Sequence, residues 1–330
     1  MEENPSGMIW KNVHILQGSA GENVYKEGKM TEIDQPTSEN QPIIKYGWLR
    51  AVLFLISALI MTVIFSSVAV IVIALIYGMD LASLSTNARD LIKDLGLPAN
   101  IIISLFGFLA MLLTAWLFRH FIDRQSFRSL GFSFTGRIKD LLFGFILGFV
   151  MISAGFVVLL VSGTLSLEMI QANGLLLFGY LIFFLIGSCN EEIMIRGYIL
   201  TNLCSSMNRY LALFLSSLLF ALMHLGNSNV TWLAFINILL AGVLLGIYFI
   251  HQKNLWLPIG LHFSWNYFQG PVYGFEVSGV NIKGMVIQNM SGEDWLTGGP
   301  FGLEGSLITT VLMVLAITVL HLKYGRPESV

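Results

Sequence analysis

Long apolar segments separated by short polar ones make up most of the chain from residue 47 onward. A membrane-spanning helix needs about 20 mostly apolar residues. The pattern therefore predicts an all-α, polytopic transmembrane helix bundle of about eight helices. The fifth and seventh are short and carry polar residues. The predicted spans are 49–77, 98–119, 140–163, 174–200, 210–225, 230–250, 255–269 and 304–322. The GxxxG pattern from Gly144 to Gly148 further predicts close packing of the third span against a neighbouring helix.

Composition and charge support the same class. The 330-residue chain is 55% hydrophobic and 12% charged, whereas an average soluble domain is about 25% charged. The net charge of −2 gives no global field for binding nucleic acid, so we expect no such partner. The two cysteines, Cys189 and Cys204, lie in or beside apolar segments and predict neither a disulfide framework nor a zinc knuckle. Membrane lipid is the partner that the composition implies.

Loop charges predict the orientation of the bundle. Lys and Arg are frequent in the loop 119–139 and near both ends of the membrane region, but sparse in the loops on the other side. Cytoplasmic loops carry the excess of basic residues, and an even number of spans places both termini on one side. We therefore expect an integral, multi-pass membrane protein with both termini in the cytoplasm. The glycine-rich segment 270–303 is then outside, either as a lid over a site or as a loose connection.

Ionisable and amide residues gather in the second half of the chain, inside the predicted spans. Charge at bilayer depth costs about 2.5–3.5 kcal/mol per residue on insertion scales, and such residues are usually functional. We therefore expect a buried site within the fourth, fifth and seventh spans. Its candidate residues are Glu191, Glu192, Arg196, His224, His262 and Asn266.

The stretch EEIMIR supplies three of these residues. Glu192 and Arg196 are four positions apart, so they share a helix face and can form an ion pair. Pairing lowers the cost of burying both charges. Glu191 lies about 100° around the helix and cannot share that partner in the same way. We interpret Glu192 and Arg196 as a supporting pair, and Glu191 as the reactive carboxylate.

The stretch FALMH places Phe220 and His224 four positions apart on the next helix. The midpoint between Glu191 and His224 falls at the predicted helix–helix turn. Both residues then lie about 24 Å from that turn at 1.5 Å per residue, hence at similar depth. A carboxylate and an imidazole that are level across a helical hairpin can hold one water between them.

The stretch HFSWN places His262 and Asn266 on one face of the seventh span, after Pro258 and Gly260. Two hydrogen-bond donors aimed at a cavity are what a developing oxyanion needs. For all site residues to meet, we expect the hairpin end at 200–209 to project from the membrane as a helical, cytoplasmic segment. We also expect the cavity to open on that side.

The three motifs EExxxR, FxxxH and HxxxN, in this order on separate helices, resemble those of the CAAX protease and bacteriocin-processing (CPBP, Abi) family of intramembrane proteases, which includes the type II CAAX prenyl endopeptidases. The resemblance covers about residues 174–270. Together with the composition, it divides the chain into three expected parts: a flexible tail at 1–46, which its polar composition indicates, N-terminal transmembrane helices at 47–170 and a CPBP-like protease core at 171–325. The tail, the first span and the 270–303 segment draw no support from the resemblance.

The resemblance implies endopeptidase activity on membrane-associated or prenylated proteins and peptides. It implies that Glu191 and His224 activate water and that His262 and Asn266 hold the tetrahedral intermediate. Glu192, Arg196 and Phe220 would support the site. A zinc ion held by Glu191, His224 and His262 is possible, but the HExxH motif of zincins is missing from the sequence. We favour a metal-free site that requires no cofactor.

Two other classes of function fit a membrane bundle with buried charges. A proton-coupled transporter also uses Glu, His and Arg in its spans, but it commonly shows matching broken helices in both halves of the chain. Here the candidate residues lie in the C-terminal half alone. A non-catalytic membrane scaffold is the other alternative, although every motif residue is in place.

Overall fold

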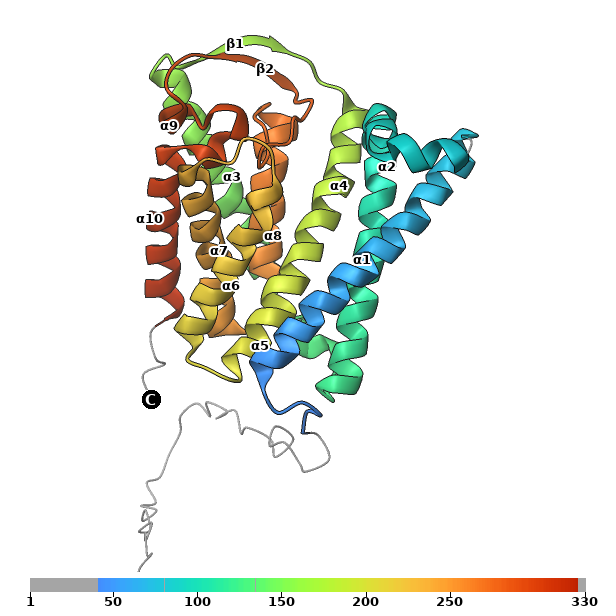
Figure 1. Ribbon diagram of the computed structural model, residues 1–330. Helices are drawn as coiled ribbons and strands as arrows, with labels where there is room; N and C mark the ends of the chain where they lie inside the picture. The colour runs from blue at the N-terminus through green and yellow to red at the C-terminus, as the bar shows by residue number, and fades with distance from the viewer. Residues whose placement is uncertain (1–40, 80, 134, 326–330) are drawn as a thin grey trace, which may run out of the picture. The chain divides into compact units, whose positions relative to one another are not determined.

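A computed structural model describes residues 41–325, except for residues 80 and 134 and for the side chains of 81–94. Most of the tail predicted at 1–46 therefore lies outside the described residues. The long helices are α1 (Gly47–Tyr77), α2 (Leu81–Leu117), α3 (Ile138–Val161), α4 (Gly174–Glu192), α6 (Arg209–Met223), α7 (Trp232–Gln252), α8 (Trp256–Tyr267) and α10 (Leu307–Tyr324). They form an upright bundle, with a small sheet across one end (Figure 1). The predicted all-α polytopic class is confirmed.

Seven of the helical segments in the described part of the chain are long and apolar enough to cross a membrane. They correspond to seven of the eight predicted spans. Helix α2 begins at Leu81, well before the predicted boundary, and continues through Pro98. The predicted loop 78–97 is therefore largely helical. A proline inside a helix removes one backbone hydrogen bond without necessarily ending the helix.

The predicted span at 255–269 is a short interior helix. Helix α8 has 12 residues and continues as one π-helical turn, Phe268–Val272. The backbones of α8 and α3 approach each other very closely. A Cβ added at Gly144 would lie 2.2 Å from the carbonyl oxygen of Leu257, and one at Gly148 would lie 2.6 Å from that of Leu261. The close packing predicted from the GxxxG pattern is confirmed, and it fixes the helix that carries His262.

The fourth span is one continuous helical rod of three parts. Helix α4 ends at Glu192, a π-helical segment follows at Ile193–Leu200, and α5 (Thr201–Cys204) completes the rod. Each residue of the π-helical segment is buried. π-Helical turns widen the backbone spiral and are frequent at functional sites. This one begins directly after the two glutamates. The expected helical extension near 200–209 is observed only as far as Cys204.

Two short strands close one end of the bundle. Strand β1 (Leu165–Ile170) pairs antiparallel with β2 (Val286–Met290), with an irregularity between Leu167 and Met169. Neither strand was predicted, because short exposed strands lack the strong periodicity of the spans. The predicted loop 164–173 and segment 270–303 thus form an ordered cap, which also contains α9 (Asp294–Thr297).

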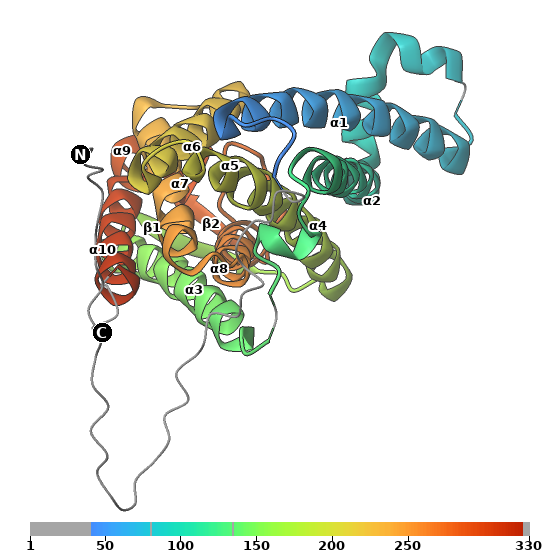
Figure 2. The same ribbon diagram turned by 90° about the horizontal axis from the view of Figure 1, so that it is seen from below.

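The opposite end, which we call the base, contains the start of α1, α5 and the end of α10 (Figure 1). A buried ion cluster holds it together. Asp123 accepts from Arg50 at 2.6 Å and from Arg119 at 2.9 Å. Arg50 also donates to Ser205 at 3.0 Å, which ties α1 to the end of the fourth span. Seen from below, α1 lies across the outside of α2 and α4, away from α3 and α10 (Figure 2).

Candidate active site

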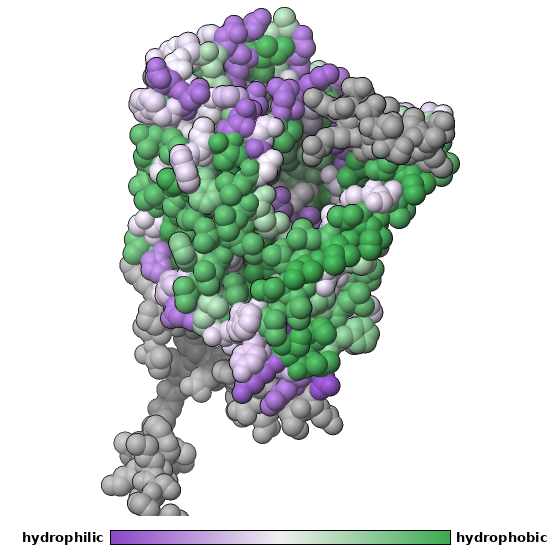
Figure 3. All heavy atoms as spheres, viewed as in Figure 1, coloured by the Kyte–Doolittle hydropathy of each residue, from purple (hydrophilic) through white to green (hydrophobic). Residues whose placement is uncertain are grey.

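A cavity of about 520 Å³ opens among the helices. Its wall includes Thr62 and Ser66 of α1, residues of α2, α4, α6, α7 and α8, and part of the cap. The surface is hollowed beside α1, and hydrophilic residues are visible inside a largely hydrophobic rim (Figure 3). The predicted site residues that line the cavity are Glu191, Phe220, His224, His262 and Asn266. Three separately placed motifs therefore meet in one chamber.

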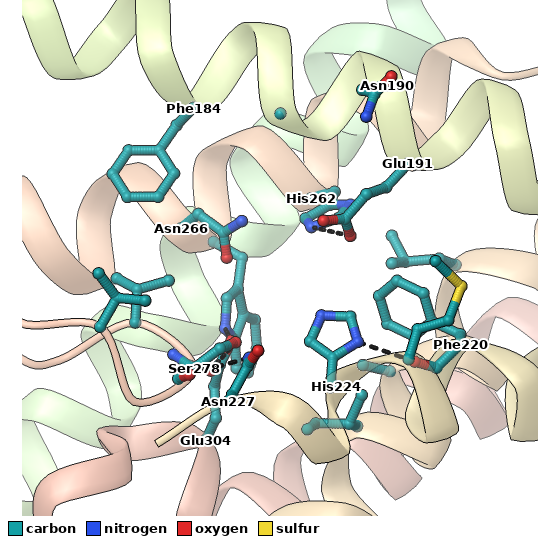
Figure 4. Close-up of a pocket in the computed structure, with 18 of the residues that line it drawn as sticks. Phe184, Asn190, Glu191, Phe220, His224, Asn227, His262, Asn266, Ser278 and Glu304 are labelled. Carbon is teal, nitrogen blue, oxygen red and sulfur yellow. Dashed lines mark hydrogen bonds and ion pairs between the residues drawn. The ribbon is translucent and has the colours of Figure 1, made fainter. Parts of the chain in front are cut away.

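Glu191 reaches this cavity from α4. Its carboxylate points toward His262, with His224 across the open space (Figure 4). Oε2 of Glu191 lies 3.8 Å from Nε2 of His262, and the side chain is 33% exposed. The same Oε2 atom is buried and accepts no hydrogen bond in the described structure. A carboxylate oxygen without a protein donor can accept from a bound water or substrate.

Glu192 lies behind Glu191 and is fully buried. Its Oε1 atom accepts from Arg196 at 2.7 Å and contacts Nδ1 of His262 at 2.8 Å. Arg196 also donates to the carbonyl of Gly242 at 3.1 Å. Its guanidinium carbon lies 4.7 Å from the centroid of the Phe220 ring. The predicted Glu192–Arg196 pair is therefore formed. Through Glu192 it also holds the imidazole of His262.

His224 is the first residue beyond α6. Its Nδ1 lies 2.8 Å from the carbonyl oxygen of Phe220. A carbonyl can only accept, so Nδ1 carries the hydrogen and, in the neutral ring, Nε2 has the free lone pair. Figure 4 shows the ring facing the cavity. The ring of Phe220 packs against it, with centroids 4.6 Å apart.

His262 and Asn266 approach from α8. The Nδ1 atom of His262 faces a carboxylate acceptor, so it carries a hydrogen, and Nε2 points toward Glu191. Asn266 projects its amide into the cavity beside them (Figure 4). Both residues occupy the cavity face of α8, as their four-residue spacing predicted.

The possible zinc set of Glu191, His224 and His262 is not assembled as a metal site. Among the described residues, no group of three or more His, Cys, Asp or Glu side chains is placed to hold a metal ion. His262 contacts Glu192 through Nδ1, which leaves Nε2 facing Glu191 at 3.8 Å. The three side chains are therefore not preassembled around a metal ion in this arrangement.

Sequence reasoning missed a second polar network at the cavity. The carboxylate of Glu304 accepts from Nε1 of Trp265 at 3.1 Å, and from N and Oγ of Ser278 at 2.8 and 2.7 Å. The carbonyl of Ser278 accepts from Asn227 at 3.0 Å. Trp265 precedes Asn266, and Asn227 follows His224 by three residues. We call this the cap latch, because it joins both sides of the site through the cap. The one available signal was Glu304 at the start of an apolar span.

The depth of the site agrees with the hairpin estimate. Glu191 precedes the end of α5 by 13 residues, and His224 follows the start of α6 by 15. The side on which the cavity opens differs from the expectation. Its lining includes Asn227, Ser278 and Val280 from the capped end, and no residue of 200–209. The expected opening toward the 200–209 end is wrong, because α6 ends at the site and the cavity continues beyond it along residues of the capped end.

Comparison with known families gives one match, and it falls on this core. Residues 173–268 match the type II CAAX prenyl endopeptidase Rce1-like family. This Rce1-like segment contains all three motifs, so the resemblance that the motifs suggested is confirmed. It spans less than a third of the chain. No curated protein and no solved structure gave a significant match. The Rce1-like segment and the apolar helices together support an integral membrane protein of the CAAX protease class.

Proposed function

We propose that the chain is an intramembrane endopeptidase in which Glu191 and His224 activate a water and in which His262 and Asn266 stabilise the oxyanion. The observation that carries the proposal is the meeting of an unpartnered carboxylate oxygen and a correctly oriented imidazole in one cavity. The substrates are polypeptides that are anchored in or on the membrane.

The water is held by two acceptors. It donates one hydrogen to Glu191 and the other to Nε2 of His224, whose Nδ1 hydrogen is committed to the carbonyl of Phe220. Both of its hydrogens are then engaged, and an oxygen lone pair faces the substrate carbonyl. As the O–C bond forms, Glu191 takes the proton, and it later returns that proton to the leaving amine.

The carbonyl oxygen becomes an oxyanion during this attack. Asn266 donates to it from the amide group that faces the cavity, and His262 donates from Nε2. Donation from Nε2 requires His262 to carry both ring hydrogens, a form that the neighbouring carboxylates of Glu191 and Glu192 stabilise. Donors placed in advance where charge develops are among the largest contributions to catalysis.

The test is cleavage of a panel of quenched fluorescent peptides, with and without a prenyl group, by protein reconstituted in lipid nanodiscs. Glu191→Gln removes the base while keeping the shape of the side chain, so cleavage should stop. Glu168→Gln on the exposed face of β1 is the matched control and should cleave as the wild type does. Wild-type cleavage by Glu191→Gln would refute this mechanism.

A further inference from the structure

Basic residues are concentrated at the base of the bundle. The base is one contiguous surface, because Arg50 contacts Asp123 and Ser205, and Leu255 donates to the carbonyl of Gly131 at 3.0 Å. The basic residues in or next to the segments that meet there are Lys45, Arg50, Arg119, Arg124, Arg128, Arg137, Lys139, Arg209, Lys253 and Lys323.

The capped end has far fewer basic residues. In the 164–173, 226–231 and 270–303 segments, Lys283 is the single Lys or Arg. Arg89 and Lys93 precede the second span. An excess of Lys and Arg in short loops marks the cytoplasmic side. The base is therefore the end that faces the cytoplasm, and the cap is the end that faces away from it.

The cavity belongs to the capped half. Asn227, Ser278 and Val280 lie on its wall, and Val280 is 55% exposed. Helix α6 has only 15 residues, or about 22 Å, so it reaches from the base only to the level of His224. The bilayer core is about 30 Å thick. The remaining depth above His224 is occupied by loop and cap, which carry polar groups that need water or protein partners.

The cavity also reaches the lipid-facing side of the bundle. Thr62 and Ser66 of α1 contribute to its wall, and the hollow beside α1 is visible from the side of the molecule (Figure 3). Arg50 anchors helix α1 at the base. Farther along α1, next to Thr62, the side chains of Leu59 and Val63 are 52% and 66% exposed. A polypeptide that lies in the membrane can enter here without crossing the base.

We infer that the active site faces the non-cytoplasmic side and takes polypeptide segments from the outer half of the bilayer, next to the non-cytoplasmic ends of membrane anchors. The part of this inference that concerns the cleaved polypeptide rests on the proposed peptidase activity, whereas the orientation of the cavity does not. A peptide presented from the cytoplasm would meet the packed base, where the ion cluster of Arg50, Asp123 and Arg119 closes the bundle.

The orientation is tested with single cysteines in a Cys189→Ser, Cys204→Ser background that also carries Glu191→Gln, so that no activity is needed. A membrane-impermeant maleimide is added to intact bacterial cells. We expect Ser291→Cys and Val280→Cys to be labelled, and Ser206→Cys to be labelled only after lysis. Labelling of Ser206→Cys in place of Ser291→Cys overturns the inference. So does labelling of Ser291→Cys with Val280→Cys protected, because the mouth would then not open on that side.

The substrate is tested by mapping new protein N-termini in membranes of cells that express the wild type or Glu191→Gln. We expect wild-type-specific N-termini to lie next to the non-cytoplasmic ends of predicted spans. Cleavage sites at cytoplasmic ends overturn the inference while supporting the peptidase. Identical N-termini in both cell lines, together with the expected labelling, would refute the proposed peptidase activity but would still support the inferred orientation.

Discussion

Nδ1 of His262 lies 2.8 Å from Oε1 of Glu192, although the two residues are 70 positions apart in the chain. The same oxygen also accepts from Arg196 at 2.7 Å. One buried carboxylate thus sets the ring orientation of a histidine on another helix, while its sequence neighbour Glu191 projects into the cavity. The two adjacent glutamates are expected to respond very differently to mutation.

Glu192→Ala should destabilise the protein by about 3–5 kcal/mol, because it leaves the buried charge of Arg196 without its partner. Glu191→Ala should leave stability nearly unchanged, since its Oε2 has no protein donor to lose, while cleavage is lost. The measurements are thermal unfolding in detergent and peptide cleavage on the same samples. Equal loss of stability in the two variants would contradict the separate roles of the two glutamates.

Asn266→Ala should lower kcat by about 10²–10³ and leave KM nearly unchanged, because a donor to the oxyanion acts only in the transition state. Asn266 gives a cleaner test than His262, which also contacts Glu192. Steady-state kinetics with the best peptide of the panel provide the measurement. A change confined to KM would reassign Asn266 to substrate binding.

Chelation should leave the activity unchanged. The described residues offer no cluster of three His, Cys, Asp or Glu side chains that could hold a metal ion. Protein dialysed against a strong chelator, with its metal content measured by mass spectrometry, should cleave at the original rate. Stoichiometric zinc whose removal abolishes cleavage, and whose return restores it, would show that the metal-free proposal is incorrect.

Much of the architecture could be predicted, because membrane spans are long and their periodicity is strong. The pairing of Glu192 with Arg196 followed from helical spacing alone. The contact between Glu192 and His262 did not, because it depends on how α8 packs on α4. The cap was missed for a similar reason. Its strands are short and mostly exposed, and its links to the site through Glu304 are tertiary contacts that leave no local pattern.

The cap latch provides a test of how the two sides of the site are held together. Glu304→Ala should destabilise the protein by about 3 kcal/mol or more, since it leaves several donors from Trp265 and Ser278 unsatisfied. Ser278→Gly should cost about 1 kcal/mol. It removes the hydroxyl but keeps the backbone N–H, and Gly tolerates the φ of 49° at this position. Thermal unfolding of the two variants measures both losses of stability. A larger cost for Ser278→Gly would show that the hydroxyl, not the carboxylate, maintains the latch.

The α3–α8 contact should be the most sensitive apolar interface near the site. A leucine at Gly148 would force α3 away from Leu261 and Trp265, because a Cβ there already approaches the Leu261 carbonyl to 2.6 Å and the Trp265 nitrogen to 3.0 Å. Overpacking of this kind typically costs about 1–3 kcal/mol, and here it also displaces the helix that carries His262 and Asn266. We therefore expect Gly148→Leu to lower kcat at temperatures where the protein is still folded. Gly174→Ala is the matched control, since a Cβ at this first residue of α4 meets nothing within 4 Å and the residue is not on the cavity wall. It should keep wild-type activity and keep wild-type stability or gain slightly. If Gly148→Leu unfolds at the wild-type temperature and cleaves at the wild-type rate, then the position of α8 is not set by α3.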